Sequence, residues 1–210
     1  FVRQRGSLLA HIQITHHQYN VDPPGKRITY RSNREGLGEG FEDSSVRQSI
    51  AADLALADHY EVTIGELELA VLRQARIHDP NALALLTSVP GIGKVLALTI
   101  LYEIHDISRF PSVRDFASYS RLVKCERTSA GKSLGTGGNK IGNAYLKWAF
   151  SEAAVLFIAK SEQGRTVLTR LERKYGKPKA LSVLAHKLGR AVYYMLARKQ
   201  AFDPQRFATS

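Results

Sequence analysis

The sequence has almost no cysteine and no long hydrophobic run, and each absence excludes a class of protein. Cys125 is the single cysteine among 210 residues, so the chain has no internal disulfide framework and fits a reducing cytoplasm. One thiol cannot build a zinc site, and the seven histidines do not fall at paired ligand spacings. No apolar run approaches the roughly 18 residues of a membrane-spanning helix. We therefore expect no metal site in this chain and no membrane segment.

The start of the chain lacks both a methionine and a leader. It begins at Phe1, which predicts a fragment or a processed product. No charged segment followed by an apolar one opens it, as a secretion signal would. The length allows one sizeable domain or two small ones.

Acidic residues are scarce in the second part of the chain. Residues 1–80 hold 9 Lys and Arg against 11 Asp and Glu, whereas residues 81–210 hold 21 against 8, giving net charges of −2 and +13. A positive field of this size suits a polyanion, because cations that neutralise phosphates release condensed counterions. A ribosome-like surface, or one that only confers solubility, is the alternative. We expect nucleic acid to bind through residues 81–210.

Proline and glycine are scarce over long stretches in which apolar residues recur at helical spacing. From Ser44 to His78 there is one glycine and no proline, which predicts one long amphipathic helix. Its length favours a spacer or a coiled-coil pairing surface, with ordinary two-helix packing as the alternative. Shorter helices are expected at residues 7–19, 81–88, 94–104, 112–119, 143–160, 164–175 and 178–199.

The expected fold is mainly α-helical and has two parts. Residues 1–80 form a helical, coiled-coil-like linking arm, through which we expect the chain to form a homo-oligomer. Within it, prolines and alternating glycines predict a flexible loop at residues 22–43, with weak strand potential at residues 28–30. Residues 81–210 form an α-helical domain that contains a helix-hairpin-helix.

The helix-hairpin-helix pattern lies at residues 83–104, where a Val-Pro-Gly-Ile-Gly turn joins two apolar helices. Gly91 and Gly93 allow positive φ and a close approach to a phosphate. The N–H groups that open the second helix, together with Lys94, then face the anion, while Ile92 plugs into the helix pair. Such contacts grip the backbone of DNA without reading its sequence. A tight hairpin with no ligand is the alternative. Valine at either glycine is expected to weaken binding without unfolding the domain.

Between residues 120 and 142 the helical pattern lapses into a polar, glycine-rich stretch. A basic loop of this kind docks against phosphates, although plain connectors share the composition. Gly131-Lys132-Ser133 looks like the end of a nucleotide-binding P-loop, but Glu126 stands where that motif needs glycine, and no hydrophobic strand precedes it. We therefore expect no ATP site. The DNA contacts expected in this stretch are Arg127, Lys132 and Lys140.

Several separated motifs resemble one protein family when they are read in order. They are Leu85-Leu86-Thr87-Ser88-Val89-Pro90-Gly91-Ile92-Gly93, Ile107-Ser108-Arg109-Phe110, Phe116-Ala117-Ser118-Tyr119 and Gly137-x-x-Lys140-x-Gly142-Asn143-x-x-Leu146. They resemble the transposase family of insertion sequences 110, 116 and 902, whose members include bridge-RNA-guided recombinases. The resemblance is good over about residues 83–200, whereas the N-terminal helices share only their general helical character with the family.

The resemblance implies a division of labour within a longer protein. Family members join an N-terminal RuvC-like domain, with four metal-binding acids, through a coiled coil to a C-terminal domain. Nothing before residue 80 shows the strands and spaced acids of a RuvC-like fold, so only the C-terminal part is matched. Mg²⁺ is then expected in the missing nuclease domain, with no cofactor in this chain. DNA and a guide RNA are the implied partners, and the bacterial cytoplasm, at the nucleoid, is the implied location.

The family's C-terminal domain supplies a serine that attacks a DNA phosphate and forms a covalent intermediate. On the family's pattern the matching residue is Ser129. A serine hydroxyl is a poor nucleophile until a base, a metal or a neighbouring charge activates it. Arg127 and Lys132 would stabilise the phosphate's charge, while the other domain would hold the metal. Members often have glycine directly after this serine, whereas an alanine intervenes here, so Ser133 remains a rival register.

Two other functions fit the same residues. A non-enzymatic helix-hairpin-helix module of the repair or junction-processing type would use the hairpin alone and give Ser129 no role. An RNA-binding protein is the second, since similar hairpins occur in ribosomal components. Spaced acids on alternating hydrophobic strands upstream of Phe1 would favour the transposase, whose isolated C-terminal part is expected to bind nucleic acid without cutting it.

Overall fold

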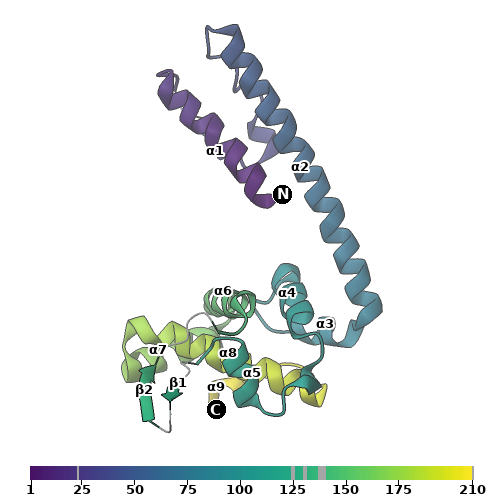
Figure 1. The fold of residues 1–210 in the computed structure, drawn as a ribbon, viewed down its shortest axis with the longest axis vertical. Helices are drawn as coiled ribbons and strands as arrows, with labels where there is room; N and C mark the ends of the chain where they lie inside the picture. Colours follow the sequence, from purple (N-terminus) through teal and green to yellow (C-terminus); the bar gives the residue numbers. More distant parts are fainter. Residues whose placement is uncertain (23, 124–125, 130–131, 137–140, 210) are drawn as a thin grey trace. The chain divides into compact units, whose positions relative to one another are not determined.

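The fold is that of a computed structural model, which describes residues 1–22, 24–123, 126–129, 132–136 and 141–209. Over these residues the chain is mainly α-helical, as the sequence predicts (Figure 1). It divides into two compact units, Phe1–Val71 and Leu72–Ser210. The division lies inside the long helix, whereas the sequence suggested a boundary at residue 80. No described helix is long and apolar enough to cross a membrane.

The long helix and all seven shorter helices expected from the sequence are present, with bounds that differ by a few residues. The first unit contains α1 Val2–Gln18, the 3-10 helix η1 Arg31–Asn33 and most of α2 Ser44–His78. The second contains α3 Pro80–Thr87, α4 Lys94–Ile104, the 3-10 helix η2 Ile107–Arg109, α5 Val113–Tyr119, β1 Glu126–Ser129, β2 Lys132–Thr136, α6 Ala144–Lys160, α7 Glu162–Tyr175, α8 Lys177–Arg198 and α9 Pro204–Thr209.

The first unit is an antiparallel pair made by α1 and the first half of α2. Phe1 stacks on Tyr60 with ring centroids 5.8 Å apart, whereas His11 Nδ1 lies 2.6 Å from Asp53 Oδ2, so the two helices run in opposite directions. Apolar side chains at helical spacing meet between them and form a small core of their own. This core contains Leu9, Ile12, Ile28, Phe41, Val46, Ile50 and Ala57.

Residues 22–43, which the sequence predicts as a flexible loop, contribute to that core. Ile28 and Phe41 are both buried, and Phe41 packs edge-on against His16 of α1 with ring centroids 4.8 Å apart. Residues 28–30 form a turn, so the weak strand potential read there was wrong. The carbonyl groups of Ile28 and Thr29 accept hydrogen bonds from a buried arginine instead of from a neighbouring strand.

That arginine, Arg34, ties the connection to α2. Its guanidinium donates to the carbonyl oxygens of Ile28 at 2.8 Å and Thr29 at 3.0 Å. It also pairs with the carboxylates of Asp58 and Glu61. A buried guanidinium is stable only when its donors are satisfied in this way. The first unit is therefore held by one charge network as well as by its apolar seam.

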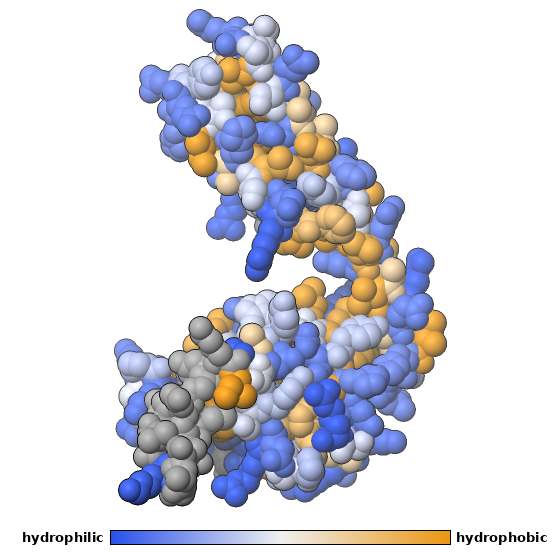
Figure 2. Space-filling view, in the orientation of Figure 1, coloured by the Kyte–Doolittle hydropathy of each residue, from blue (hydrophilic) through white to orange (hydrophobic). Residues whose placement is uncertain are grey.

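The middle of α2 carries apolar side chains that the first unit leaves uncovered. They appear as hydrophobic patches along the long helix in Figure 2. Exposed apolar side chains of this kind on a long helix are typical of a surface that pairs with another protein. The exposed residues are Leu56, Val62, Leu67, Leu69 and Val71.

The second unit is built around α8, which packs against α5, α6 and α7. The apolar stripe that the sequence shows on this helix is core, with Leu184, Leu188 and Val192 fully buried. Phe116 of α5 and Phe150 of α6 meet edge-on beside it, with ring centroids 6.0 Å apart. This core fixes the positions of α4, the second helix of the predicted helix-hairpin-helix, and of α6.

Candidate nucleic-acid interface

Helices α3 and α4 form the helix-hairpin-helix that the sequence predicts. The side chain of Asp79 caps α3 by accepting a hydrogen bond from Ala82 N at 2.8 Å. In the turn, Ile92 N donates to Val89 O at 3.0 Å. Val89 and Ile92 are only 1% and 3% exposed. These two side chains hold the turn from the inside, so that its outer edge is left to the backbone and to Lys94.

The two glycines of the turn have different structural roles. Gly91 has φ +96°, and a Cβ there would come within 2.5 Å of Phe157 N and 2.8 Å of the Leu156 carbonyl carbon on α6. Gly93 has φ −83° and ψ −177°, and a Cβ there would meet nothing within 4 Å. Positive φ is therefore found at Gly91 and not at Gly93. The close approach at Gly91 is to α6, so this glycine is required for packing.

The N-terminus of α4 is open to solvent. Gly93 is the N-cap and provides no side-chain cap. Gly93, Lys94 and Val95 are all exposed, Val95 to 56%. The N–H groups of a first helical turn lack partners within the helix, and the helix dipole places partial positive charge on them. An anion can thus approach this end beside the Lys94 ammonium.

A short β-hairpin stands where the sequence showed only a polar gap. Strands β1 and β2 are antiparallel. Glu126 pairs with Thr136 and Thr128 with Ser133, with an irregular register between Glu126 and Thr128. The sequence signal fails because strands of four and five residues carry too few alternations for a period to be read.

The hairpin carries three of the residues predicted for DNA chemistry. Ser129 pairs with Lys132 at the end of the ladder, and Lys132 is exposed. Arg127 lies in β1 at the register irregularity. The rival Ser133 occupies the neighbouring rung, opposite Thr128. Lys140, the third DNA contact predicted in this stretch, lies outside the described residues.

A clamp holds together the two ends of the segment that contains this hairpin. Arg121 Nε donates to the carbonyl oxygens of Ile141 at 3.1 Å and Gly142 at 2.9 Å. Asn143 N donates to Tyr119 O at 2.6 Å. Gly142 has φ +94°, and a Cβ there would lie 2.5 Å from Tyr119 O, so glycine is needed for the closure. The segment therefore leaves and rejoins the domain at one fixed point.

Asn143 links this clamp to the core. Its side-chain oxygen accepts from Leu146 N at 2.9 Å and caps α6, while its amide nitrogen donates to a Glu103 carboxylate oxygen on α4. The same amide reaches the Tyr119 hydroxyl, and this hydrogen bond lowers the pKa of Tyr119 from its ordinary value near 10. The sequence motif contained Gly142-Asn143, but nothing in it indicated Glu103 or Arg121 as partners.

The two units differ in the sign of their net charge. The second unit holds 23 Lys and Arg against 9 Asp and Glu, a net charge of +14, and the first holds 7 against 10, a net charge of −3. In the part of the chain that the structure describes, no group of three or more His, Cys, Asp or Glu side chains is placed to hold a metal ion. The described site is therefore suited to binding phosphate through cations and backbone N–H groups.

Comparison with known proteins matches the same region. Residues 83–168 match the model of the "Transposase IS116/IS110/IS902 family". The transposase for insertion sequence element IS1111A of Coxiella burnetii (strain RSA 493 / Nine Mile phase I) is 25% identical over 119 residues, 55% of this chain and 33% of its own length. The transposase for insertion sequence element IS1328 of Yersinia enterocolitica is 28% identical over 156 residues, 70% of this chain and 46% of its own length. The chain thus spans between a third and a half of these relatives.

Proposed function

Because residues 83–168 match the IS116/IS110/IS902 transposase family and the relatives found are transposases, we propose that the chain is the DNA-binding and serine-bearing C-terminal part of a longer transposase of that family. The observation that carries the proposal is the open N-terminus of α4 in a unit of net charge +14. Backbone N–H groups and Lys94 bind a DNA phosphate there, and because they touch no base edge they bind without regard to sequence.

In this proposal Ser129 is the nucleophile. Its hydroxyl oxygen attacks a phosphorus atom of the DNA backbone, and a P–O bond to Ser129 forms as the P–O bond to the neighbouring nucleoside breaks. The serine proton passes to a base, and the leaving nucleoside oxygen takes up a proton. Arg127 and Lys132, two residues before and three residues after Ser129 in the sequence, offset the charge that builds on the phosphate.

The Mg²⁺ that the family resemblance implies does not fit the described residues, which gather no set of carboxylates. In the proposal it belongs to a separate RuvC-like domain, and no step assigned to this chain passes through it. Two further partners complete the proposal. A guide RNA binds the basic second unit, and a second copy of the chain pairs with exposed apolar residues of α2.

Salt titration of DNA binding tests the proposal. We expect the 210-residue chain to bind duplex DNA with an affinity that falls linearly on a log–log plot against salt, by about 0.9 in slope for each phosphate contact. Lys94→Gln should reduce the slope by about 0.9 because it removes one such contact. Fluorescence anisotropy with a labelled duplex measures both quantities.

The matched control is Arg3→Gln, which removes one exposed charge from α1 in the acidic first unit. It should leave both the affinity and the slope as they are in the parent. A flat titration, or an equal loss in Arg3→Gln and Lys94→Gln, would count against binding through the second unit.

A further inference from the structure

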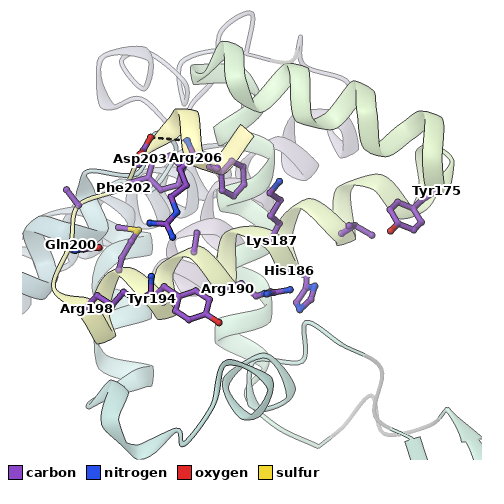
Figure 3. Close-up of a pocket in the computed structure, with 15 residues that line it drawn as sticks. Tyr175, His186, Lys187, Arg190, Tyr194, Arg198, Gln200, Phe202, Asp203 and Arg206 are labelled. Carbon is purple, nitrogen blue, oxygen red and sulfur yellow. Dashed lines mark hydrogen bonds between the residues drawn. The ribbon is translucent and has the colours of Figure 1, made fainter. Parts of the chain in front are cut away.

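A groove runs along α8 on the side where α9 packs (Figure 3). Its volume is about 960 Å³. Lys187, Arg190, Tyr194 and Arg198 recur along α8 at intervals of three and four residues, so they share one face over a length of roughly 17 Å. Arg206 of α9 lines the groove from the other side. No described residue of the α3–α4 hairpin or of the β1–β2 hairpin, which carries Ser129, lines this groove.

The groove contains far more positive than negative charge. Asp203 is the single carboxylate that lines it. One oxygen of Asp203 accepts hydrogen bonds from Gln205 N at 2.9 Å and Arg206 N at 3.0 Å, so its charge is directed at the first turn of α9. The ion pairs that join two described residues all lie in the first unit. The arginines that line the groove therefore have no ion-pair partner among the described residues.

Burial and the neighbouring positive charges affect two titratable groups of α8. Burial, and then the charges of Arg170 and Arg190, lower the pKa of Lys187. Burial and Arg190 likewise lower the pKa of His186. Like charges held close to one another disfavour the protonated forms. A bound anion would relieve the repulsion, so the groove is arranged for a ligand with several negative charges.

Aromatic rings orient the cations and also remain accessible. The Arg198 guanidinium carbon lies 4.7 Å from the centroid of the Tyr194 ring, and Lys187 Nζ lies 4.9 Å from that of Phe207. Tyr194 is 36% exposed and Tyr175, which also lines the groove, is 43% exposed. Positive charge along a groove combined with exposed tyrosines suits single-stranded nucleic acid, whose unpaired bases can stack on aromatic rings.

We propose that this groove binds an unpaired strand of nucleic acid, with Arg190, Arg198 and Arg206 holding phosphates and Tyr194 stacking on a base. The inference rests on the proposed function, because it assigns a second contact to the same basic unit. It goes further by assigning two kinds of nucleic acid to two different surfaces of this unit. The α3–α4 hairpin takes the backbone of a duplex, and the α8–α9 groove takes a strand whose bases are free.

A charge variant tests the proposal in the whole 210-residue chain. Arg190→Gln/Arg198→Gln should weaken binding of a labelled single strand of about twelve nucleotides at least tenfold. It should also lower the salt slope by about 1.4, since each contact with a single strand contributes about 0.7. Duplex affinity should change by less than about threefold, because the hairpin is intact. Anisotropy titrations measure all three quantities, and circular dichroism confirms folding.

The matched control is Arg114→Gln/Arg173→Gln. It removes the same charge from exposed positions of α5 and α7 that do not line the groove, and it should lower both affinities by less than about threefold. If the groove and control variants weaken single-strand binding equally, the surface is only diffusely basic and the proposal fails. If the groove variant weakens duplex and single strand alike, the proposed separation is wrong.

A ring variant tests the stacking contact. Tyr194→Ala should weaken single-strand binding about tenfold and leave the duplex unaffected, and Tyr194→Phe should restore the affinity because it keeps the ring. Oligo(dT) and oligo(U) distinguish DNA from RNA as the source of the strand. Full single-strand binding by Tyr194→Ala would overturn the stacking role. The effect of Lys94→Gln on duplex binding tests the α3–α4 hairpin and the proposed function, and it is independent of the test of the groove.

Discussion

Replacing Gly91 with alanine is expected to lower the free energy of unfolding of the second unit by about 4 kcal/mol. The left-handed φ of +96° costs about 1–3 kcal/mol for a residue with a Cβ. Overpacking against the backbone of Phe157, 2.5 Å from the Cβ position, costs a further 1–3 kcal/mol or so. Neither segment can move freely, because α6 lies in the core. Urea unfolding followed through Trp148 of α6, the single tryptophan, measures the change.

The matched variant Gly93→Ala should change the free energy of unfolding by less than about 1 kcal/mol. Its φ of −83° suits any residue, and no atom lies within 4 Å of the Cβ position. Its methyl group stands at the exposed N-terminus of α4, so duplex DNA should bind more weakly. Gly93 is therefore the glycine that reports on phosphate access. Parent-like stability in Gly91→Ala would show that the turn and α6 are not packed as described.

This pair revises the expectation that valine at either glycine weakens binding in a folded domain. The sequence pattern treats Gly91 and Gly93 alike, since both stand in the same turn. The structure separates them through Phe157, a residue of another helix. At Gly91 we expect loss of folding, and at Gly93 loss of binding alone.

The second large effect concerns chemistry and applies to a protein in which this chain is joined to a RuvC-like domain with its Mg²⁺. Ser129→Ala should abolish the covalent protein–DNA adduct, because it removes the oxygen that would bond to phosphorus. DNA affinity should stay near that of the parent, since the hairpin and its cations are unchanged. Denaturing gel electrophoresis with an end-labelled DNA substrate measures the adduct, and anisotropy measures binding.

Ser133→Ala is the matched control for this variant. Ser133 pairs with Thr128 on the rung next to that of Ser129, so the two changes disturb the hairpin to a similar degree. We expect the control to form nearly as much adduct as the parent. The 210-residue chain by itself should form none at any Mg²⁺ concentration. Equal loss in both single variants would point to disruption of the hairpin instead of loss of a nucleophile.

The helices could be predicted from sequence because each one repeats a local pattern. The expected bounds of residues 44–78 and 94–104 agree with α2 and α4, since apolar side chains recur at helical spacing and proline or glycine stands near the ends. Helix α9 was missed because its six residues hold fewer than two turns of the pattern. The β-hairpin escaped detection for the same reason.

The partners of the candidate site could not be predicted in this way, because they are distant in sequence. The approach of Gly91 to Phe157, and the hydrogen bond from Asn143 to Glu103, depend on how α4 and α6 pack. The basic groove arises only when α9, which packs against α7, brings Arg206 to the groove that Arg190 of α8 also lines. Spacing within one helix indicates which residues share a face, and only the tertiary fold shows what that face meets.

Mapping the residue that becomes linked to DNA tests the central claim most directly. The adduct formed by the protein with its nuclease domain would be trapped on a labelled DNA end, digested with protease and nuclease, and sequenced by mass spectrometry. The account predicts a nucleotide remnant on the peptide that contains Ser129. A remnant on Ser133 would correct the register and keep serine chemistry. Normal adduct formation by Ser129→Ala/Ser133→Ala would contradict the account and leave a non-enzymatic DNA-binding module in its place.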